Sequence, residues 1–494
     1  MSAETAVAQA VPGAEEGRLS FGEKVGYSLG DAASNFYWKT FEFFLMFFYT
    51  EVFGISAAAV GTMLLITRIG DAVADPIMGT VADRTRTRWG HFRPYILWFA
   101  MPLAVAGVLT FTTPDMGHGG KVVYAYVTYS LLMLMYTAVN IPYSALMGVM
   151  TSNSKERTSL SSFRFIGAFT VATFVQYCTR NLAQYFGLSA EQNAGHSLLG
   201  HPLEWVGWFF SKDFMSLPQT ATQQAHGWQM TMALYGVLAV IMLIGCFAIT
   251  RERVVPPAQQ EASLKKDLLE VARNRSFLAL LGVLMLVLTA FVVKGSVSAY
   301  YFKYFVRRED LLGPFLVSNG LAFLAAVFCT NLIKNYFDKK VLFIGSIGVG
   351  GLIVCLFWLA GPASIGLLFA LQIGSSFVLG ANSPLVWAMF ADTADDAEWR
   401  TGRRNTGLVF AAAIFGTKVG VAIGAWVLGI ILAMFGYVAN AEQTASSLLG
   451  IRLSMSLIPG VILVVAAALM KYYPLDDKLM IRIEKDLKAR KAEA

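Results

Sequence analysis

The sequence predicts an all-α membrane protein with twelve transmembrane helices, arranged as two bundles of six. Three observations lead to this prediction. Hydrophobic residues make up 56% of the 494 residues, charged residues only 14%, and the mean hydropathy is +0.56, whereas a soluble domain carries about 25% charged residues. Apolar stretches long enough to cross a bilayer recur along the whole chain. The loops between these stretches alternate between strongly basic and weakly basic.

Each span is placed where about 20 mostly apolar residues follow one another. The first six spans are predicted at 25–50, 57–82, 94–113, 121–149, 160–179 and 229–250, and the last six at 277–302, 313–333, 341–360, 364–391, 406–436 and 449–471. Residues 1–24 form a polar tail, 251–276 a polar linker and 474–494 a basic tail. This division predicts one six-helix bundle over 25–250 and a second over 277–473.

The basic residues predict the orientation of the chain in the membrane. Loops after the even-numbered spans hold most of them, for example Arg84, Arg86, Arg88 and Arg93 after the second span. The positive-inside rule places this side in the cytosol. We therefore expect both termini to be cytoplasmic and the chain to lie in the cytoplasmic (inner) membrane. The net charge of +7 is divided among separate loops, which argues against a nucleic-acid surface.

The most informative motif is a pair of carboxylates inside the second span. Asp71 and Asp75 are four residues apart and Arg68 precedes Asp71 by three, so the three side chains share one helical face. A charge at the bilayer centre costs about 2.5–3.5 kcal/mol, so this face is expected to meet a water-filled cavity or charged partners. One proton or monovalent cation would neutralise its net charge. A purely structural salt bridge of Arg68 with one aspartate is the alternative.

Polar and aromatic residues recur on other predicted spans. In the first span they follow steps of four, three and four at Asp31, Asn35, Trp38 and Glu42, and Lys39 is placed to pair with Glu42. Later spans add Asn140, Ser144, Lys294, Gln372, Trp387 and Lys418. Sugar hydroxyls need polar partners and the apolar face of a sugar ring packs on aromatic rings, so these stripes predict a sugar cavity. Interhelical hydrogen bonding is the alternative for each residue taken alone.

Two adjacent runs resemble a known family. Arg68-Ile-Gly-Asp71-Ala-Val-Ala-Asp75-Pro-Ile-Met-Gly79, followed by Asp83-Arg-Thr-Arg-Thr-Arg88-Trp-Gly90-His-Phe-Arg93-Pro94, is similar to the signature of the glycoside-pentoside-hexuronide cation symporters. Shorter matches at Asn140-Ile-Pro142 and Gly416-Thr-Lys418 extend the resemblance over nearly the whole chain. The resemblance implies the major facilitator fold and sugar uptake coupled to sodium, lithium or protons.

The resemblance also implies roles for single residues. Asp71 and Asp75 would bind the cation with help from Thr137, and Lys418 would bridge the cation and substrate regions. Arg164 matches an arginine near the cytoplasmic gate, and we group it with the substrate-binding residues.

The chain departs from the melibiose-type pattern at four positions, one of which is Ser144 in place of an aromatic residue of the fourth span. Ala74 replaces an asparagine, which removes one oxygen ligand and favours protons over sodium as the coupling ion. Asn35 and Asn140 stand where that pattern has acids, which makes a melibiose-like substrate less expected.

A cluster of arginines after the second span predicts a cytoplasmic gate. Arg84, Arg88 and Arg93 could pair with Asp392 and Asp395 of the other half when the cavity closes toward the cytosol. The alternative is that these arginines only set the topology.

Together these features predict a secondary active transporter that moves a sugar or glycoside inward with H⁺ or Na⁺ by alternating access. We expect it to act as a monomer surrounded by membrane lipid. No nucleophile–base arrangement, metal-ligand spacing or phosphate loop is found, so neither an enzyme nor a cofactor is predicted. Two alternatives stay open: a cation-coupled transporter of an amphipathic lipid or other non-sugar solute, and a membrane sensor.

Overall fold

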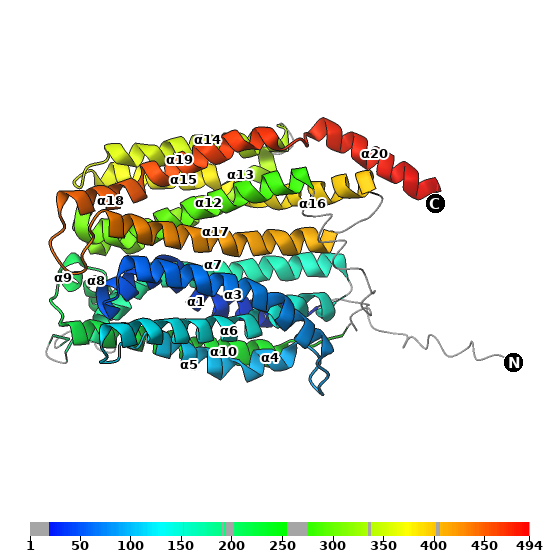
Figure 1. Ribbon diagram of the computed structural model, residues 1–494. Helices are drawn as coiled ribbons and strands as arrows, with labels where there is room; N and C mark the ends of the chain where they lie inside the picture. The colour runs from blue at the N-terminus through cyan, green and yellow to red at the C-terminus, as the bar shows by residue number, and fades with distance from the viewer. Residues whose placement is uncertain are drawn as a thin grey trace.

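The computed structural model describes residues 19–151, 153–189, 192–193, 202–253, 274–333, 337–401 and 406–493. Long helices run along one common axis (Figure 1). We call the end near α20 (Asp477–Glu493) the terminus end, and the opposite end, near α8 (Pro202–Phe209) and α9 (Lys212–Met215), the far end. In the described part of the chain, β structure is limited to one isolated bridge between Thr87 and Gly90. The predicted all-α class is therefore confirmed.

The helices fall into two groups that follow the order of the chain. The first group holds α1 (Phe21–Phe43), α2 (Leu45–Phe47), the π-helical turn η1 (Phe48–Phe53), α3 (Ala57–Arg84), α4 (Arg93–Trp98), α5 (Ala100–Thr110), α6 (His118–Met150), α7 (Ser154–Gly187) and α10 (Ala221–Ile249). The second group holds α12 (Arg275–Tyr300), η2 (Tyr301–Val306), η3 (Glu309–Leu311), α13 (Leu312–Ile333), α14 (Lys339–Leu356), η4 (Phe357–Leu359), α15 (Ile365–Gly380), α16 (Asn382–Thr401), α17 (Thr406–Met434), α18 (Ala445–Met455), α19 (Leu457–Leu469) and η5 (Met470–Tyr472). Most helix contacts lie within one group, and α3 against α17 is the most extensive between them.

Ten helices in the described residues are long and apolar enough to cross a membrane. The two other predicted spans are helical but interrupted. Span 25–50 is built from α1, α2 and η1, and its α1 portion carries the polar stripe that contains Asp31 and Glu42. Span 94–113 is divided into α4 and α5 at Phe99. Length and hydropathy alone therefore recover ten of the twelve expected spans.

Polar caps fix where several helices begin. Ser20 accepts a hydrogen bond from the Glu23 N–H, and the Glu23 carboxylate accepts one from the Ser20 N–H, which forms a capping box at the start of α1. Thr220 and Gln223 form the same motif at the start of α10. These caps satisfy N–H groups that the first helical turn leaves without partners.

Glycines allow α3 and α17 to approach closely and to form a seam between the two groups. A Cβ atom on Gly429 would lie 2.5 Å from the Ala57 carbonyl oxygen, and one on Gly61 would lie 3.1 Å from the Trp426 Cα. Only small residues permit such backbone proximity between membrane helices. The two helices run antiparallel (Figure 1), so the seam continues from the far end toward the carboxylates of α3.

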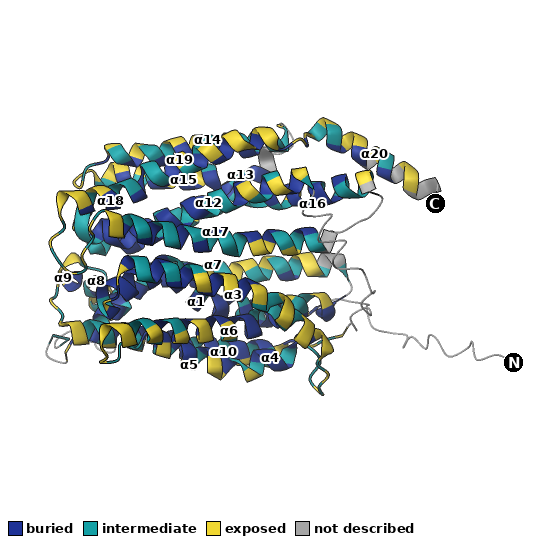
Figure 2. Ribbon diagram, viewed as in Figure 1, coloured by how far each residue is buried: buried dark blue, intermediate teal, exposed yellow. Residues whose placement is uncertain are grey.

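Two segments outside the spans are also folded. Between α7 and α10, Phe209 of α8 is buried, and the Asn181 amide donates to its carbonyl at 2.6 Å. Figure 2 shows exposed residues along the outer helices, such as α14 and α20. The predicted basic tail forms α20, where Trp399 Nε1 donates to Asp486 at 3.0 Å and Ile483 is buried. Residues 1–18 of the predicted N-terminal tail and 254–273 of the predicted linker lie outside the described residues.

Candidate functional site

An ion cluster joins α3, α6 and α17. Lys418 Nζ lies 2.8 Å from Asp71 Oδ2 and also forms an ion pair with Asp75. The Thr137 hydroxyl donates to Asp75 Oδ1 at 3.2 Å and to Asp71 Oδ1. The Asp71 side chain is only 2% exposed and that of Asp75 15%. The two aspartates, Thr137 and Lys418 are therefore brought together, and Lys418 links the two halves of the molecule.

The charges in this cluster do not balance. Two carboxylates and one ammonium sum to a formal charge of −1. Among the described residues both aspartates form ion pairs with Lys418 and not with Arg68, whose guanidinium carbon lies 4.6 Å from the centre of the Trp38 ring. Its buried Nη1 has no hydrogen-bond partner in the described residues. The alternative of a structural salt bridge between Arg68 and one aspartate is therefore not observed. Lys418 pairs with both aspartates instead, and one negative charge remains unbalanced.

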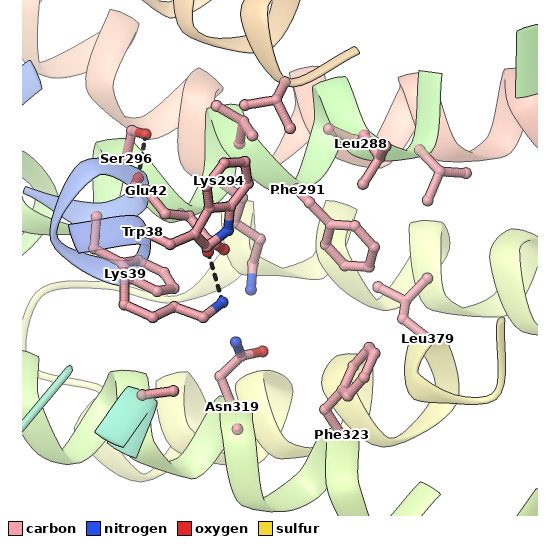
Figure 3. Close-up of a pocket in the computed structure, with 18 of the residues that line it drawn as sticks. Trp38, Lys39, Glu42, Leu288, Phe291, Lys294, Ser296, Asn319, Phe323 and Leu379 are labelled. Carbon is pink, nitrogen blue, oxygen red and sulfur yellow. Dashed lines mark hydrogen bonds and ion pairs between the residues drawn. The ribbon is translucent and has the colours of Figure 1, made fainter. Parts of the chain in front are cut away.

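A cavity of about 560 Å³ lies between the two groups of helices. Its lining comes from α1, α2, α3, α6, α7, α12 through α17 and α19. Phe357 of η4 lies behind one wall, against Lys294. Polar side chains line it at Asp31, Asn35, Lys39, Glu42, Arg68, Gln176, Lys294, Asn319, Gln372, Ser375, Ser376, Asn382 and Thr417. Aromatic and aliphatic side chains such as Trp38, Phe291 and Phe323 fill the remaining wall (Figure 3). Such a mixture suits a ligand that has both polar groups and an apolar face.

The predicted stripe of α1 does face this cavity. Asp31 is held by Arg164, whose Nε lies 3.1 Å from Oδ2 and whose Nη2 lies 3.3 Å from Oδ1. The Asn35 amide donates to the Asp31 carbonyl at 2.8 Å. Trp38 stacks on the ring of Tyr136 at a centroid distance of 6.1 Å.

Further along α1, the Lys39 ammonium lies 2.6 Å from Glu42 Oε2, as the sequence predicts. Ser296 of α12 donates to the Glu42 carbonyl at 2.8 Å and so ties this part of α1 to the second group of helices.

The second group contributes the opposite wall. Lys294 donates a short hydrogen bond to Gln372 Oε1, and its ammonium lies 4.7 Å from the centre of the Phe357 ring. Trp387 lines the cavity and stacks on Phe410 with an interplanar angle of 7°. Lys294, Gln372 and Trp387 therefore lie where a bound molecule could touch them.

The structure does not place every predicted substrate-binding residue on the cavity. Asn140 is half-buried and Ser144 is exposed, and neither is part of the lining. They lie one to two turns beyond Tyr136, in the stretch where Tyr143 stacks on Tyr27. Lys418 and the two aspartates also lie outside the lining, although Arg68 and Thr417 beside them belong to it. The ion cluster is therefore adjacent to the cavity instead of part of its wall.

Two of the predicted gate residues, Arg93 and Asp392, have partners within their own halves in this structure. Arg93 Nη2 donates to the Phe247 carbonyl at 2.6 Å, and Asp392 pairs with Lys339 at 2.6 Å. Arg84 and Arg88 are exposed at the terminus end. Asp395 has a partner of its own. Pairing of these arginines with Asp392 or Asp395 across the gate stays a prediction about another conformation.

A second bridge between the halves, at the far end, was missed by the sequence prediction. Glu51 is 4% exposed and lies 2.7 Å from Lys303 Nζ. It also accepts hydrogen bonds from the Tyr304 hydroxyl at 2.6 Å, the Tyr437 hydroxyl and the Asn440 N–H at 3.2 Å. The sequence signal for this bridge was Glu51 itself, an acidic residue at the end of the apolar first span.

Another ion pair at the far end also joins the halves. Arg180 of α7 donates to Glu309 Oε2 at 2.9 Å through Nε and at 2.5 Å through Nη2. Together with the Glu51 contacts, this pair holds the two halves against each other at that end.

Comparisons with known proteins agree with this architecture. The family described as "MFS/sugar transport protein" matches residues 26–477. Among curated relatives, a candidate glycoside/cation symporter of Escherichia coli (strain K12), YagG, is 36% identical over 471 residues and covers 95% of each chain. The isoprimeverose transporter of Lactiplantibacillus pentosus is 34% identical (96% of this chain, 93% of the relative), and a glucuronide carrier protein homologue of E. coli (strain K12) is 35% identical (96% and 97%).

Solved structures support the fold alone. A bacterial homologue of the human lysosomal transporter Spinster has a TM-score of 0.64 at 14% identity and covers 94% of this chain and 96% of its own. A D-xylose–proton symporter has a TM-score of 0.60 at 14% identity and covers 92% and 98%.

Proposed function

Because the chain belongs to the MFS/sugar transport protein family and, with it, to the glycoside-pentoside-hexuronide cation symporters that its motifs resemble, we propose that it carries a sugar or glycoside across the membrane together with a cation. The observation that carries this proposal is the ion cluster of Asp71, Asp75, Thr137 and Lys418 beside the cavity. It is buried, it spans the two halves of the molecule, and it lacks one positive charge.

The ion cluster supplies a physical mechanism for coupling. In the empty protein Lys418 of α17 is held by both aspartates of α3. A cation that binds to Asp71 and Asp75 competes with the Lys418 ammonium, because the cation and the ammonium need the same carboxylate oxygen atoms. Breaking a buried ion pair by removing one partner costs about 3–5 kcal/mol, so a cation that substitutes for Lys418 changes the balance between conformations substantially. Cation binding then frees the two halves to move around the substrate.

Protons are our first choice for the coupling ion. The described ligands at the cluster are the four carboxylate oxygens and the Thr137 hydroxyl, and Ala74 offers no side-chain oxygen. A proton needs only one carboxylate oxygen, whereas an alkali cation needs several oxygen ligands around it. Sodium-stimulated uptake at constant pH, without proton movement, would overturn this choice.

The arrangement of contacts between the halves suggests which side the cavity opens to. The bridges of Glu51 and Arg180 close the far end, while at the terminus end Arg93 donates to Phe247 of its own half and Arg84 and Arg88 are exposed. The basic loops place the terminus end in the cytosol. We therefore propose that both termini are cytoplasmic, that the chain is embedded in the inner membrane as a monomer, and that this structure is the inward-facing state.

Replacing Asp75 by Asn tests the coupling. The variant should lose concentrative uptake of its sugar while it still exchanges labelled for unlabelled sugar, because exchange requires no net cation movement. Uptake in proteoliposomes, driven by an imposed pH or sodium gradient over a panel of labelled mono- and oligosaccharides, measures both activities. Full concentrative uptake by the variant would refute the mechanism. Asp83→Asn, an exposed acid at the end of the same helix, serves as the matched control.

A further inference from the structure

The first long helix of each half ends at the far end in a π-helical turn. Gly54 follows η1 and Arg307 follows η2. Each of these two residues donates its N–H to the carbonyl five positions earlier, which belongs to Tyr49 in η1 and to Phe302 in η2. The next residue along the chain donates to the same carbonyl, at 3.1 Å in η1 and at 3.0 Å in η2. No other segment of the described chain is π-helical, so Gly54 and Arg307 occupy equivalent positions in the two halves.

The two turns contact each other directly. In this alignment Glu51 is equivalent to Tyr304, and the Tyr304 hydroxyl, 253 positions away, donates to Glu51 at 2.6 Å. A residue meets its own equivalent only near an axis that relates two repeats. Lys303 pairs with Glu51 at 2.7 Å, and the Thr50 and Tyr300 hydroxyls lie 2.7 Å apart. Contacts across the axis therefore hold both turns in their π-helical register. π-Helical turns of this kind are frequent at functional sites.

Arg307 has an unfavourable backbone conformation. Its φ of +56° lies in the left-handed region, which disfavours a residue with a Cβ by about 5- to 30-fold in population. At the equivalent position Gly54, with φ +85°, has no such cost. The Arg307 side chain is exposed and has no hydrogen-bond or ion-pair partner in the described part of the chain. Strain of this kind persists only where the surrounding contacts impose it, and here those contacts are the ones that close the far end.

From this arrangement we propose that the two turns act as a paired register switch. Both turns are π-helical while the far end is closed, and both take α-helical hydrogen bonds when it opens, so that Arg307 leaves the left-handed region. A change of one residue in register rotates the side chains beyond it by about 100° around the helix axis. Glu51 and Tyr304 then no longer face each other. The inference rests on the proposed transport by alternating access and specifies how its outer side opens.

Accessibility of a buried thiol from the far end tests the switch. Ser298 is 2% exposed and lines the cavity two residues before Tyr300. Ser298→Cys is introduced into the full chain after its four native cysteines are replaced by alanine. A membrane-impermeant maleimide is then added to right-side-out membrane vesicles, where labelling reports how often the far end opens.

Substitutions at the two equivalent positions should act in opposite directions. Arg307→Gly removes the strain from the closed state and should slow labelling by about 5- to 30-fold. Gly54→Ala adds strain to the closed state and should speed labelling by a similar factor. A Cβ on Gly54 meets no atom within 4 Å, so alanine there acts through the backbone alone.

Arg307→Gln separates the strain from the charge of the side chain. It removes the charge but keeps the Cβ, so labelling should stay within about twofold of the parent. Arg307→Asn should fall between the Gln and Gly variants, because asparagine tolerates the left-handed region better. Equal labelling of Arg307→Gly and Arg307→Gln would overturn the register switch while leaving transport intact. Absence of labelling in every variant, although the thiol reacts after unfolding in detergent, would instead contradict alternating access, and the proposed function with it.

Discussion

The ion cluster and the far-end bridge both join the two halves through a buried acid and a lysine, but they differ in how their charge is balanced. At the far end a single carboxylate, Glu51, meets one ammonium and three further donors, so its charge and its oxygen atoms are satisfied. In the ion cluster two carboxylates share Lys418 and Thr137, and one negative charge remains. A satisfied bridge holds two surfaces together, whereas an unbalanced one responds to an added cation.

The largest effect is expected for Asp71→Asn, which removes the unbalanced charge. The cluster then contains one acid and one lysine, as at the far end, and should no longer respond to the coupling ion. Concentrative uptake should fall by at least about 100-fold, equivalent to about 2.7 kcal/mol, because the balanced cluster no longer links cation binding to movement of the two halves. Gradient-driven uptake in proteoliposomes measures this. Retention of more than half of the uptake would show that the cluster is a static bridge like that of Glu51.

Gly429→Val should have the next largest effect, because it separates α3 from α17 at their point of close contact. The added side chain meets the Ala57 carbonyl, and overpacking of this kind costs about 1–3 kcal/mol. We expect about a tenfold loss of uptake and a lower unfolding temperature by scanning fluorimetry. Gly282→Val on α12 is the matched control, since a Cβ there meets no atom within 4 Å. Equal behaviour of the two variants would mean that the seam does not set the distance across the cluster.

Glu51→Gln tests the satisfied bridge. The amide keeps the shape of the side chain and can still accept hydrogen bonds, but it loses the ion pair with Lys303. A hydrogen bond to a charged group contributes about 1.5–3 kcal/mol. The far end should open more often, and a cysteine introduced at Ala441 should react with a membrane-impermeant maleimide roughly tenfold faster. Dependence of uptake on the coupling ion should be preserved. Loss of ion dependence in this variant would erase the distinction between the two bridges.

The smallest effect is expected at an acid that is satisfied within one half. Glu252 accepts hydrogen bonds from the N–H groups of His91 at 2.8 Å, Phe92 at 2.8 Å and Arg93 at 2.9 Å, at the start of α4. In Glu252→Gln one oxygen becomes an NH₂ group that cannot accept, so the bond from His91 is lost and the other two lose their ionic component, at a cost of about 1–2 kcal/mol in total. The unfolding temperature should fall by a few degrees while coupled uptake is unchanged. A change in ion dependence would show that this loop takes part in coupling.

Helical periodicity predicted which residues share a face, but not their depth along the helix axis. Asp31, Asn35, Trp38 and Glu42 follow helical steps and line one wall of the cavity. Asn140 and Ser144 also follow such steps on α6, yet the cavity ends before it reaches them.

Contacts between distant parts of the chain were predictable only in part. Resemblance to a family pointed to Lys418, which is 347 positions from Asp71. The partners of Glu51 lie 252 to 389 positions away, and neither periodicity nor a motif in the sequence connects them to it. Hydropathy predicted continuous spans across the breaks at Phe44 and Phe99, because it does not report backbone geometry. Pro102, which lacks an N–H and whose ring clashes with the carbonyl four residues earlier, was the sequence signal for the second break.

The glycine seam gives α3 and α17 the geometry of a lever. Gly61 is ten residues from Asp71, which at 1.5 Å per residue is about 15 Å along the helix. If the two helices pivot where Gly61 and Gly429 touch, a tilt of about 10° moves Asp71 relative to Lys418 by about 2.6 Å, by simple trigonometry on that arm. The 2.8 Å ion pair does not survive such a displacement. A rotation small enough to keep Gly61 and Gly429 in contact is therefore enough to form or break the ion pair between Asp71 and Lys418.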